Sequence, residues 1–163
     1  MNPLKRILLV EDSPRDAELA LDALEAHQLA NEVVHVRDGA DALDYLYRRG
    51  QFASRSDGQP ALVLLDLKLP KVDGLEVLRQ IKGDTALKMI PVVMMTSSRE
   101  EQDLLKSYEL GVNAYVVKPM KFQDFVEAVK QVSGFWTGIN EVPERLRRSE
   151  SVGPQPTSAS PKT

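Results

Sequence analysis

The stretch Leu62-Val63-Leu64-Leu65-Asp66 places a carboxylate directly after four apolar residues. A short run that is apolar on both faces is typical of a central parallel strand covered by helices on each side. Asp66 would then lie at the carboxyl end of this strand, the edge at which open α/β sheets place ligands and chemistry. Pro70 and the pair Asp73-Gly74 indicate a loop before the next helix. Asp66 is therefore a candidate functional residue, although an aspartate that only caps a turn would give the same local pattern.

Four further apolar runs have the length and composition of strands, over residues 7–10, 33–36, 91–96 and 114–117. Between and after the strands, the spacing of apolar residues predicts helices over about 14–26, 40–48, 74–82, 98–111 and 122–136, the fourth with Ser98 and Glu101 as a capping box. Five strands that alternate with five helices predict an α/β fold with right-handed crossovers. We expect a doubly wound five-stranded parallel sheet in a flavodoxin-like three-layer sandwich.

The composition is that of an ordinary globular protein and disfavours several classes of function. The 163 residues are 42% hydrophobic, carry a formal net charge of −3 and include no cysteine. The negative charge argues against broad binding to nucleic acid or to a membrane surface, and the lack of cysteine excludes disulfides and thiolate chemistry. Neither a signal peptide nor a run of 18 apolar residues is present, so we expect a cytoplasmic protein.

The sequence divides into a domain over residues 1–137 and a C-terminal extension over 138–163 that we expect to be partly disordered. From about Val142 onward, several prolines and serines accompany few apolar residues, and such a composition does not build a core. The segment after Trp136 is too short for a DNA-binding domain, which disfavours a transcription factor. The polar loop over 50–60 is predicted to be mobile.

Polar side chains occur at the carboxyl ends of four predicted strands: Glu11-Asp12, Asp66, Thr96 and Lys118. Because the strands are parallel, these ends meet at one edge of the sheet. Three carboxylates held close together repel one another unless a cation joins them, and oxygen ligands with room for water suit Mg²⁺. We therefore predict Mg²⁺ as a cofactor bound by Glu11, Asp12 and Asp66, with the backbone carbonyl of Lys68 as a further ligand.

The same edge suits phosphoryl transfer, which needs mainly positioning and neutralisation of charge. Asp66 would be the nucleophile, and Lys118 would supply a compact positive charge for Asp66 or for an added phosphoryl oxygen. Thr96 would hydrogen-bond the product. The bond between Lys118 and Pro119 is a candidate for the cis form, because proline lowers the penalty to roughly 0.5–1 kcal/mol.

The spacing of Glu11-Asp12, Asp66, Thr96, Tyr115 and Lys118-Pro119 resembles the receiver domain of two-component response regulators, the CheY family, over about residues 5–136. The resemblance implies that Asp66 accepts a phosphoryl group from a histidine kinase and that Glu11 and Asp12 bind Mg²⁺. It also implies that Thr96 and Tyr115 form a switch, which changes a partner-binding surface on the fourth helix, fifth strand and fifth helix. Such a protein is a phosphoacceptor that assists only its own phosphorylation and dephosphorylation, and not an enzyme acting on a separate substrate.

A narrower resemblance, to single-domain regulators that partner phytochrome-type kinases, is based on 62–67, the long loop over 50–60 and the ending over 135–143. It implies a phytochrome-type kinase as partner and a homodimer held through the fifth helix and the C-terminal extension. Phe135 and Trp136 exceed what one helix needs to cover a sheet, and Ile139 and Val142 would pack on the neighbour. The alternative is that Trp136 only closes the core of its own chain.

Two other functions compete with a phosphorylated regulator. An aspartyl-phosphate hydrolase of the haloacid dehalogenase type has a second acid two residues after the nucleophile, where this chain has Lys68. A degenerate receiver that acts only as an interaction module would lack some of the site residues, all of which are present. His27 and His35 are expected to have structural roles, since neither lies in the pattern of a phosphorelay histidine.

Overall fold

The computed structural model describes residues 5–27 and 32–147, and within them the predicted fold is confirmed. Five strands form one sheet: β1 (Arg6–Val10), β2 (Glu32–Val36), β3 (Leu62–Leu65), β4 (Val92–Thr96) and β5 (Ala114–Val117). Their order is β2-β1-β3-β4-β5, and every neighbouring pair is parallel. The strand order reverses next to β1, so the carboxyl ends of β1 and β3 form the crevice where a doubly wound sheet binds its ligands.

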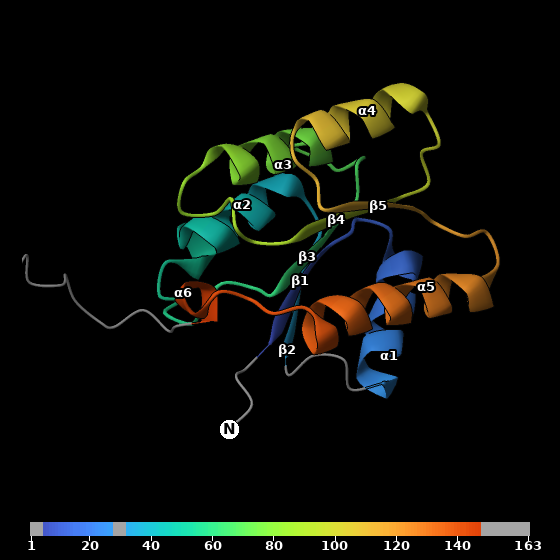
Figure 1. Ribbon diagram of the computed structural model, residues 1–163, viewed down its shortest axis with the longest axis horizontal. Helices are drawn as coiled ribbons and strands as arrows, with labels where there is room; N and C mark the ends of the chain where they lie inside the picture. Colours follow the sequence, from blue (N-terminus) through green and yellow to red (C-terminus); the bar gives the residue numbers. More distant parts are fainter. Residues whose placement is uncertain (1–4, 28–31, 148–163) are drawn as a thin grey trace, which may run out of the picture.

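Helices cover both faces of the sheet (Figure 1). The helices α1 (Pro14–Ala26) and α5 (Phe122–Gly134) lie on one face, and α2 (Gly39–Tyr47), α3 (Gly74–Gly83) and α4 (Glu101–Glu109) lie on the other. Along β3 the side chains alternate between two apolar clusters, with Leu62 and Leu64 on the α1–α5 side and Val63 and Leu65 on the α2–α3 side. The uninterrupted apolar sequence of β3 therefore fills two cores at once.

The helix starts follow the sequence signals, with one exception. Ser13 and Asp73 cap α1 and α3, since their side chains accept hydrogen bonds from backbone N–H groups three residues later. The predicted capping box of Ser98 and Glu101 does not form. The helix α4 begins at Glu101, and the Ser98 hydroxyl donates to the carboxylate of Asp103 instead.

The C-terminal extension continues the ordered structure beyond the predicted boundary. A π-helical turn, η2 (Phe135–Ile139), follows α5, and a short helix, α6 (Glu144–Arg147), comes after it. Val142 and Leu146 are buried in the α2–α3 core, and the backbone N–H of Gln59 donates to the carbonyl of Leu146 at 2.9 Å. The prediction of disorder from Val142 is therefore wrong up to residue 147. The rest of that prediction, over 148–163, lies outside the described residues.

The loop over 50–60 is fixed by many contacts, contrary to the predicted mobility. It contains a short 3-10 helix, η1 (Gly50–Phe52). The guanidinium of Arg55 lies 4.0 Å from the ring centre of Tyr45 and donates to the Tyr45 and Gly58 carbonyls and to the Asp57 carboxylate. A planar guanidinium has five N–H donors. Here the Nε–H joins the loop to α2 at the Tyr45 carbonyl, and the other bonds hold the loop to itself.

Two further features concern single predictions. The described residues contain no cis peptide bond, so the bond between Lys118 and Pro119 is trans and the predicted cis form is wrong. In the same part of the chain, none of the helices has both the length and the apolar character needed to cross a membrane.

Candidate functional site

The carboxyl ends of β1 and β3 bring three carboxylates together. Val10 pairs with Leu65 in the sheet, so Glu11 and Asp66, the next residues, emerge side by side. Their position is fixed by backbone hydrogen bonds from Asp66 N–H to the Val10 carbonyl (3.1 Å) and from Glu11 N–H to the Val36 carbonyl (3.1 Å). One carboxylate oxygen each from Glu11, Asp12 and Asp66 lies within 4.8 Å of the other two.

Lys118 extends from the end of β5 into this cluster and contacts three carboxylates. Its ammonium Nζ donates to Glu11 Oε2 (2.7 Å), Asp66 Oδ2 (2.8 Å) and Asp16 Oδ2 (2.9 Å). Burial disfavours the charged form of Lys118, but the hydrogen bonds to Asp66 and Glu11 outweigh this effect and raise its pKa. Lys118 therefore stays charged at every physiological pH. Asp16, in the first turn of α1, is a site residue that the sequence analysis missed.

Glu11 is held more firmly than the other two carboxylates. Its Oε1 accepts the backbone N–H of Ser13 at 3.0 Å, and its backbone carbonyl accepts a hydrogen bond from Nε2 of His35 on β2 at 2.8 Å. Burial, with repulsion from Asp66, raises the pKa of Glu11 despite its ion pair with Lys118. His35 thus has the structural role that was expected, next to the site.

The carboxylate cluster fits a hard divalent cation. Carboxylate oxygens are the ligands that Mg²⁺, Mn²⁺ and Ca²⁺ prefer. Glu11 and Asp66 are buried, whereas Asp12 is exposed, so one side of the cluster is open to solvent and to water ligands. On this side Asp12 and Lys68 line an open depression of about 530 Å³ together with apolar residues of the loop after β3. The role of the Lys68 carbonyl as a ligand stays a prediction.

The loop that follows Asp66 is packed tightly against the start of α3. The backbone N–H of Gly74 donates to the Leu67 carbonyl at 2.7 Å. A Cβ atom added at Gly74 would lie 2.1 Å from the carbonyl oxygen of Asp66, far inside van der Waals contact. Only glycine allows this approach, so Gly74 fixes the backbone on which the Asp66 carboxylate is placed.

Thr96 and Tyr115 each form a hydrogen bond with Ser98. Among the described residues, no hydrogen bond joins Thr96 directly to Tyr115. Thr96 is buried at the end of β4, where its Oγ1 accepts the backbone N–H of Ser98 at 3.3 Å. The Tyr115 hydroxyl donates to the Ser98 carbonyl at 3.1 Å. The Ser98 hydroxyl donates to Asp103 of α4 at 2.6 Å. The backbone of Ser98 therefore joins the end of β4 to β5, and its side chain adds a contact with α4.

A parallel sheet of this order, with an acidic cluster and a lysine at its carboxyl edge, defines a receiver-type α/β domain. Residues 7–130 match the model of the response regulator receiver domain, and the chain belongs to this family. Receiver domains of this family partner with histidine kinases.

Several relatives are similar over most of the chain. Response regulator Rcp1 from Synechocystis sp. is 43% identical over 83% of this chain and 90% of its own length, and its Mn²⁺-bound form has been solved (TM-score 0.80). The phosphorylated cyanobacterial phytochrome response regulator RcpA is 44% identical, with a TM-score of 0.81 over 86% of this chain and 99% of that one. The bacteriophytochrome response regulator AtBRR is 64% identical, with a TM-score of 0.68 over 85% and 99%.

Proposed function

We propose that this chain is a single-domain response regulator whose Asp66 accepts a phosphoryl group from a histidine kinase. The observation that carries the proposal is the arrangement around Asp66. One of its oxygens is 2.8 Å from the Lys118 ammonium, and the Glu11 and Asp12 carboxylates lie beside it. Structural likeness to phosphorylated RcpA supports this assignment.

The proposed transfer forms one bond and breaks one. An oxygen of the ionised Asp66 carboxylate attacks the phosphorus of a phosphohistidine, a P–O bond forms, and the P–N bond breaks with its electron pair left on the imidazole. Lys118, charged throughout, neutralises phosphoryl oxygens, while the Thr96 hydroxyl becomes a donor to the product. A divalent cation at Glu11, Asp12 and Asp66 would supply further charge neutralisation, and we propose Mg²⁺ for this role because it leaves room for water and phosphoryl ligands.

Labelling with acetyl phosphate tests the acceptor assignment. Incubation with acetyl phosphate and Mg²⁺ should add one phosphoryl group, read as a mass increase of the intact protein. The variant D66N should gain none, and D22N, which changes an exposed aspartate of α1, should be labelled like the wild type. Undiminished labelling of D66N would contradict the assignment, and loss of transfer on chelation with recovery by added Mg²⁺ would support the cofactor.

We further propose a phytochrome-type histidine kinase as the phosphoryl donor. RcpA and AtBRR, to which this chain is similar, are described as phytochrome and bacteriophytochrome response regulators. Because such a kinase needs ATP, the proposed partner implies a cytoplasmic location. Phosphotransfer profiling against all the histidine kinases of the source organism would test the choice of partner, and faster transfer from a kinase without a phytochrome module would contradict it.

We propose that phosphorylation changes the surface formed by α4, β5 and α5. The phosphoryl group adds about 1.5 to 2 negative charges, and the Thr96 hydroxyl can turn toward it and away from the Ser98 N–H. Ser98 also contacts Tyr115 and Asp103, so this movement would reach β5 and α4. Chemical-shift mapping with a beryllofluoride mimic should show changes on all three elements. Changes confined to the residues around Asp66 would contradict the switch.

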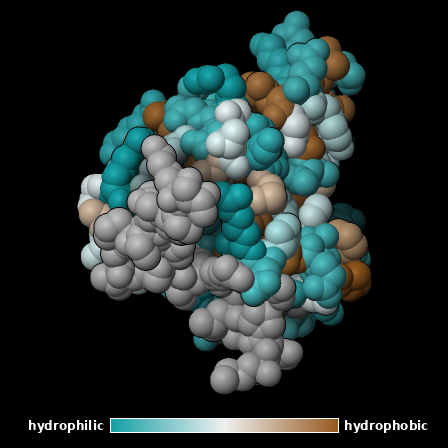
Figure 2. Space-filling view, turned by 60° about the vertical axis from the view of Figure 1, so that its left-hand side comes forward, coloured by the Kyte–Doolittle hydropathy of each residue, from teal (hydrophilic) through white to brown (hydrophobic). Residues whose placement is uncertain are grey.

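We propose a homodimer through α5 and the turn η2, with a smaller contact than the sequence predicts. The stripe on α5 is largely used by its own core, since Val126, Val132 and Trp136 pack against the α1–α5 cluster, and Val142 is buried in the other core. The side chains left exposed are Phe122, Phe135 and Ile139. They are available to a partner, whereas the face seen in Figure 2 is mostly hydrophilic with only small apolar patches.

Sedimentation tests the dimer. We expect the wild type to dimerise at tens of micromolar. The double variant F135A/I139A should weaken association at least tenfold, because Phe135 is 45% exposed and Ile139 is 74% exposed, and both would be buried at the contact. The control L105A removes an exposed leucine from α4 and should leave association unchanged. A monomeric wild type, phosphorylated or not, would refute the dimer, and weakening by L105A alone would refute its location.

A further inference from the structure

The three carboxylate partners of Lys118 differ in what happens to them during phosphoryl transfer. An ammonium group has three N–H donors, and contacts with Glu11, Asp16 and Asp66 at 2.7–2.9 Å use all three. Under the proposed function, the phosphoryl group is added to the Asp66 carboxylate, and Glu11 belongs to the cluster that suits a cation. Asp16 is neither the acceptor nor a member of this cluster, so its contact with Lys118 is the one that the reaction leaves in place.

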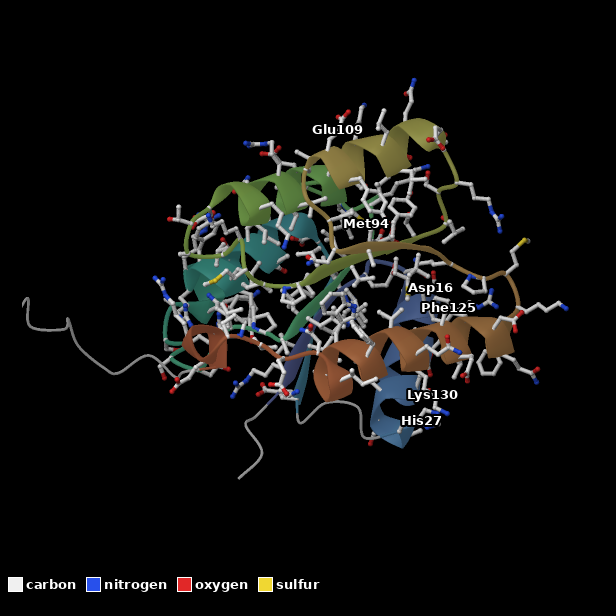
Figure 3. All side chains as sticks on the ribbon, viewed as in Figure 1. Asp16, His27, Met94, Glu109, Phe125 and Lys130 are labelled. Carbon is white, nitrogen blue, oxygen red and sulfur yellow. The ribbon has the colours of Figure 1, made fainter. Side chains whose placement is uncertain are left out.

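The position of Asp16 is well suited to a permanent contact. It lies in the first turn of α1, one turn before the buried Ala20, and Figure 3 shows it near Phe125 of α5. Asp16 and Phe125 both line a small cavity against Glu11 and Asp66. The Asp16 side chain is 28% exposed and that of Lys118 is 9% exposed, so the contact is at the rim of the site but is not fully solvated. Hydrogen bonds between charged groups in such surroundings are stronger than those in water.

We propose that Asp16 is a positioning residue that holds the Lys118 ammonium toward Asp66 while the phosphoryl group is accepted. This inference depends on the proposed function. When the phosphoryl group arrives, Lys118 must exchange its hydrogen bond with Asp66 for one with a phosphoryl oxygen. A four-carbon side chain that lost two of its three contacts would be free to leave the site. The contact with Asp16 limits that freedom and keeps one N–H directed at the reacting oxygen.

The proposal predicts different results for two substitutions at Asp16. The variant D16A removes the oxygen that accepts from Lys118, whereas D16N keeps an oxygen acceptor and removes only the charge. We expect the first-order rate of transfer from saturating acetyl phosphate to fall about ten- to a hundredfold in D16A, as for a lost hydrogen bond to a charged group. D16N should restore most of this rate. D22A, on the exposed side of the same helix, should match the wild type.

A second readout does not depend on activity. In protein with ¹⁵N-labelled lysine and no phosphodonor, the Lys118 ammonium should exchange its hydrogens with water several-fold faster in D16A than in D16N or D22A. Equal rates in D16A and D22A, or an equal loss in D16A and D16N, would overturn the role of Asp16. Labelling of D66N would overturn the acceptor assignment instead, so the two failures are distinguishable.

Discussion

Replacement of Leu146 by alanine should destabilise the protein as a core substitution does, although Leu146 lies near the end of the described chain. Leu146 is 3% exposed and packs in the cluster that also contains residues of α2 and α3. The change removes three carbon atoms, and about 0.8 kcal/mol per buried methylene gives about 2.4 kcal/mol. A partly retained cavity adds to this figure, so we expect a loss of about 2.5 to 3.5 kcal/mol. In a domain of this size the midpoint of thermal unfolding should fall by about 5–10 °C.

Urea unfolding followed by circular dichroism measures this loss directly. The matched control is L105A, because Leu105 on α4 is 55% exposed and the same three carbon atoms are removed from the surface. L105A should change the free energy of unfolding by less than about 0.5 kcal/mol. Because the contact of Leu146 is within one chain, the difference between L146A and wild type should be the same at low and high protein concentration. Equal stabilities of L146A and L105A would refute the packing of the C-terminal extension on the core.

Three shorter predictions follow from other contacts. G74A should lower the free energy of unfolding by about 1–3 kcal/mol and slow phosphorylation, because its Cβ would lie 2.1 Å from the Asp66 carbonyl oxygen. A Cβ at Gly83 in the same helix would have no atom within 4 Å, so G83A should change neither stability nor phosphorylation. Urea unfolding measures the stability, and acetyl phosphate labelling measures the phosphorylation rate. Burial raises the pKa of Glu11 from 4.5 to about 7, so without metal the folded state favours the protonated form of Glu11. The free energy of unfolding relative to E11Q should therefore fall by about 2–3 kcal/mol as the pH rises from about 4.5 to about 7. A difference in unfolding free energy that does not change with pH would contradict this. R55K should lower stability by about 1–2 kcal/mol, since lysine cannot replace the stacked, forked guanidinium, and thermal unfolding would show an unchanged midpoint if that reasoning is wrong.

The fold and most of the site follow from the order of residue types along the chain. Strands buried on both faces must be apolar without interruption, so β3 was evident from its sequence. The polar residue that ends each strand then has a fixed place, because all parallel strands end at one edge. Asp16 was missed because its place in the first turn of a helix is already explained by the helix dipole. The available signal was its spacing of four residues from Ala20, which puts both on the face toward the sheet.

The C-terminal extension and the loop over 50–60 were predicted to be less ordered than they are. Composition averages over a segment, whereas the two apolar residues Val142 and Leu146, four positions apart, are both buried in the core beside and within α6. In the loop, the ordering contacts come from Arg55, whose donors reach backbone carbonyls and whose plane stacks on Tyr45. The residue type is the same whether a charged side chain orders a loop or extends into solvent, so only its three-dimensional surroundings reveal its role.

The hydrogen bonds of Ser98 determine how the proposed coupling between Thr96 and Tyr115 could be detected. Both are made by main-chain atoms of Ser98, its N–H toward Thr96 and its carbonyl toward Tyr115, and only the contact with Asp103 uses the side chain. Every amino acid except proline provides the same N–H and carbonyl, so substitutions at position 98 would leave both hydrogen bonds in place. A conventional mutational scan would therefore report that the side chain of Ser98 is not needed for this link. An amide-to-ester replacement at Ser98, which removes the N–H and keeps every side chain, is the chemical change that would expose the link.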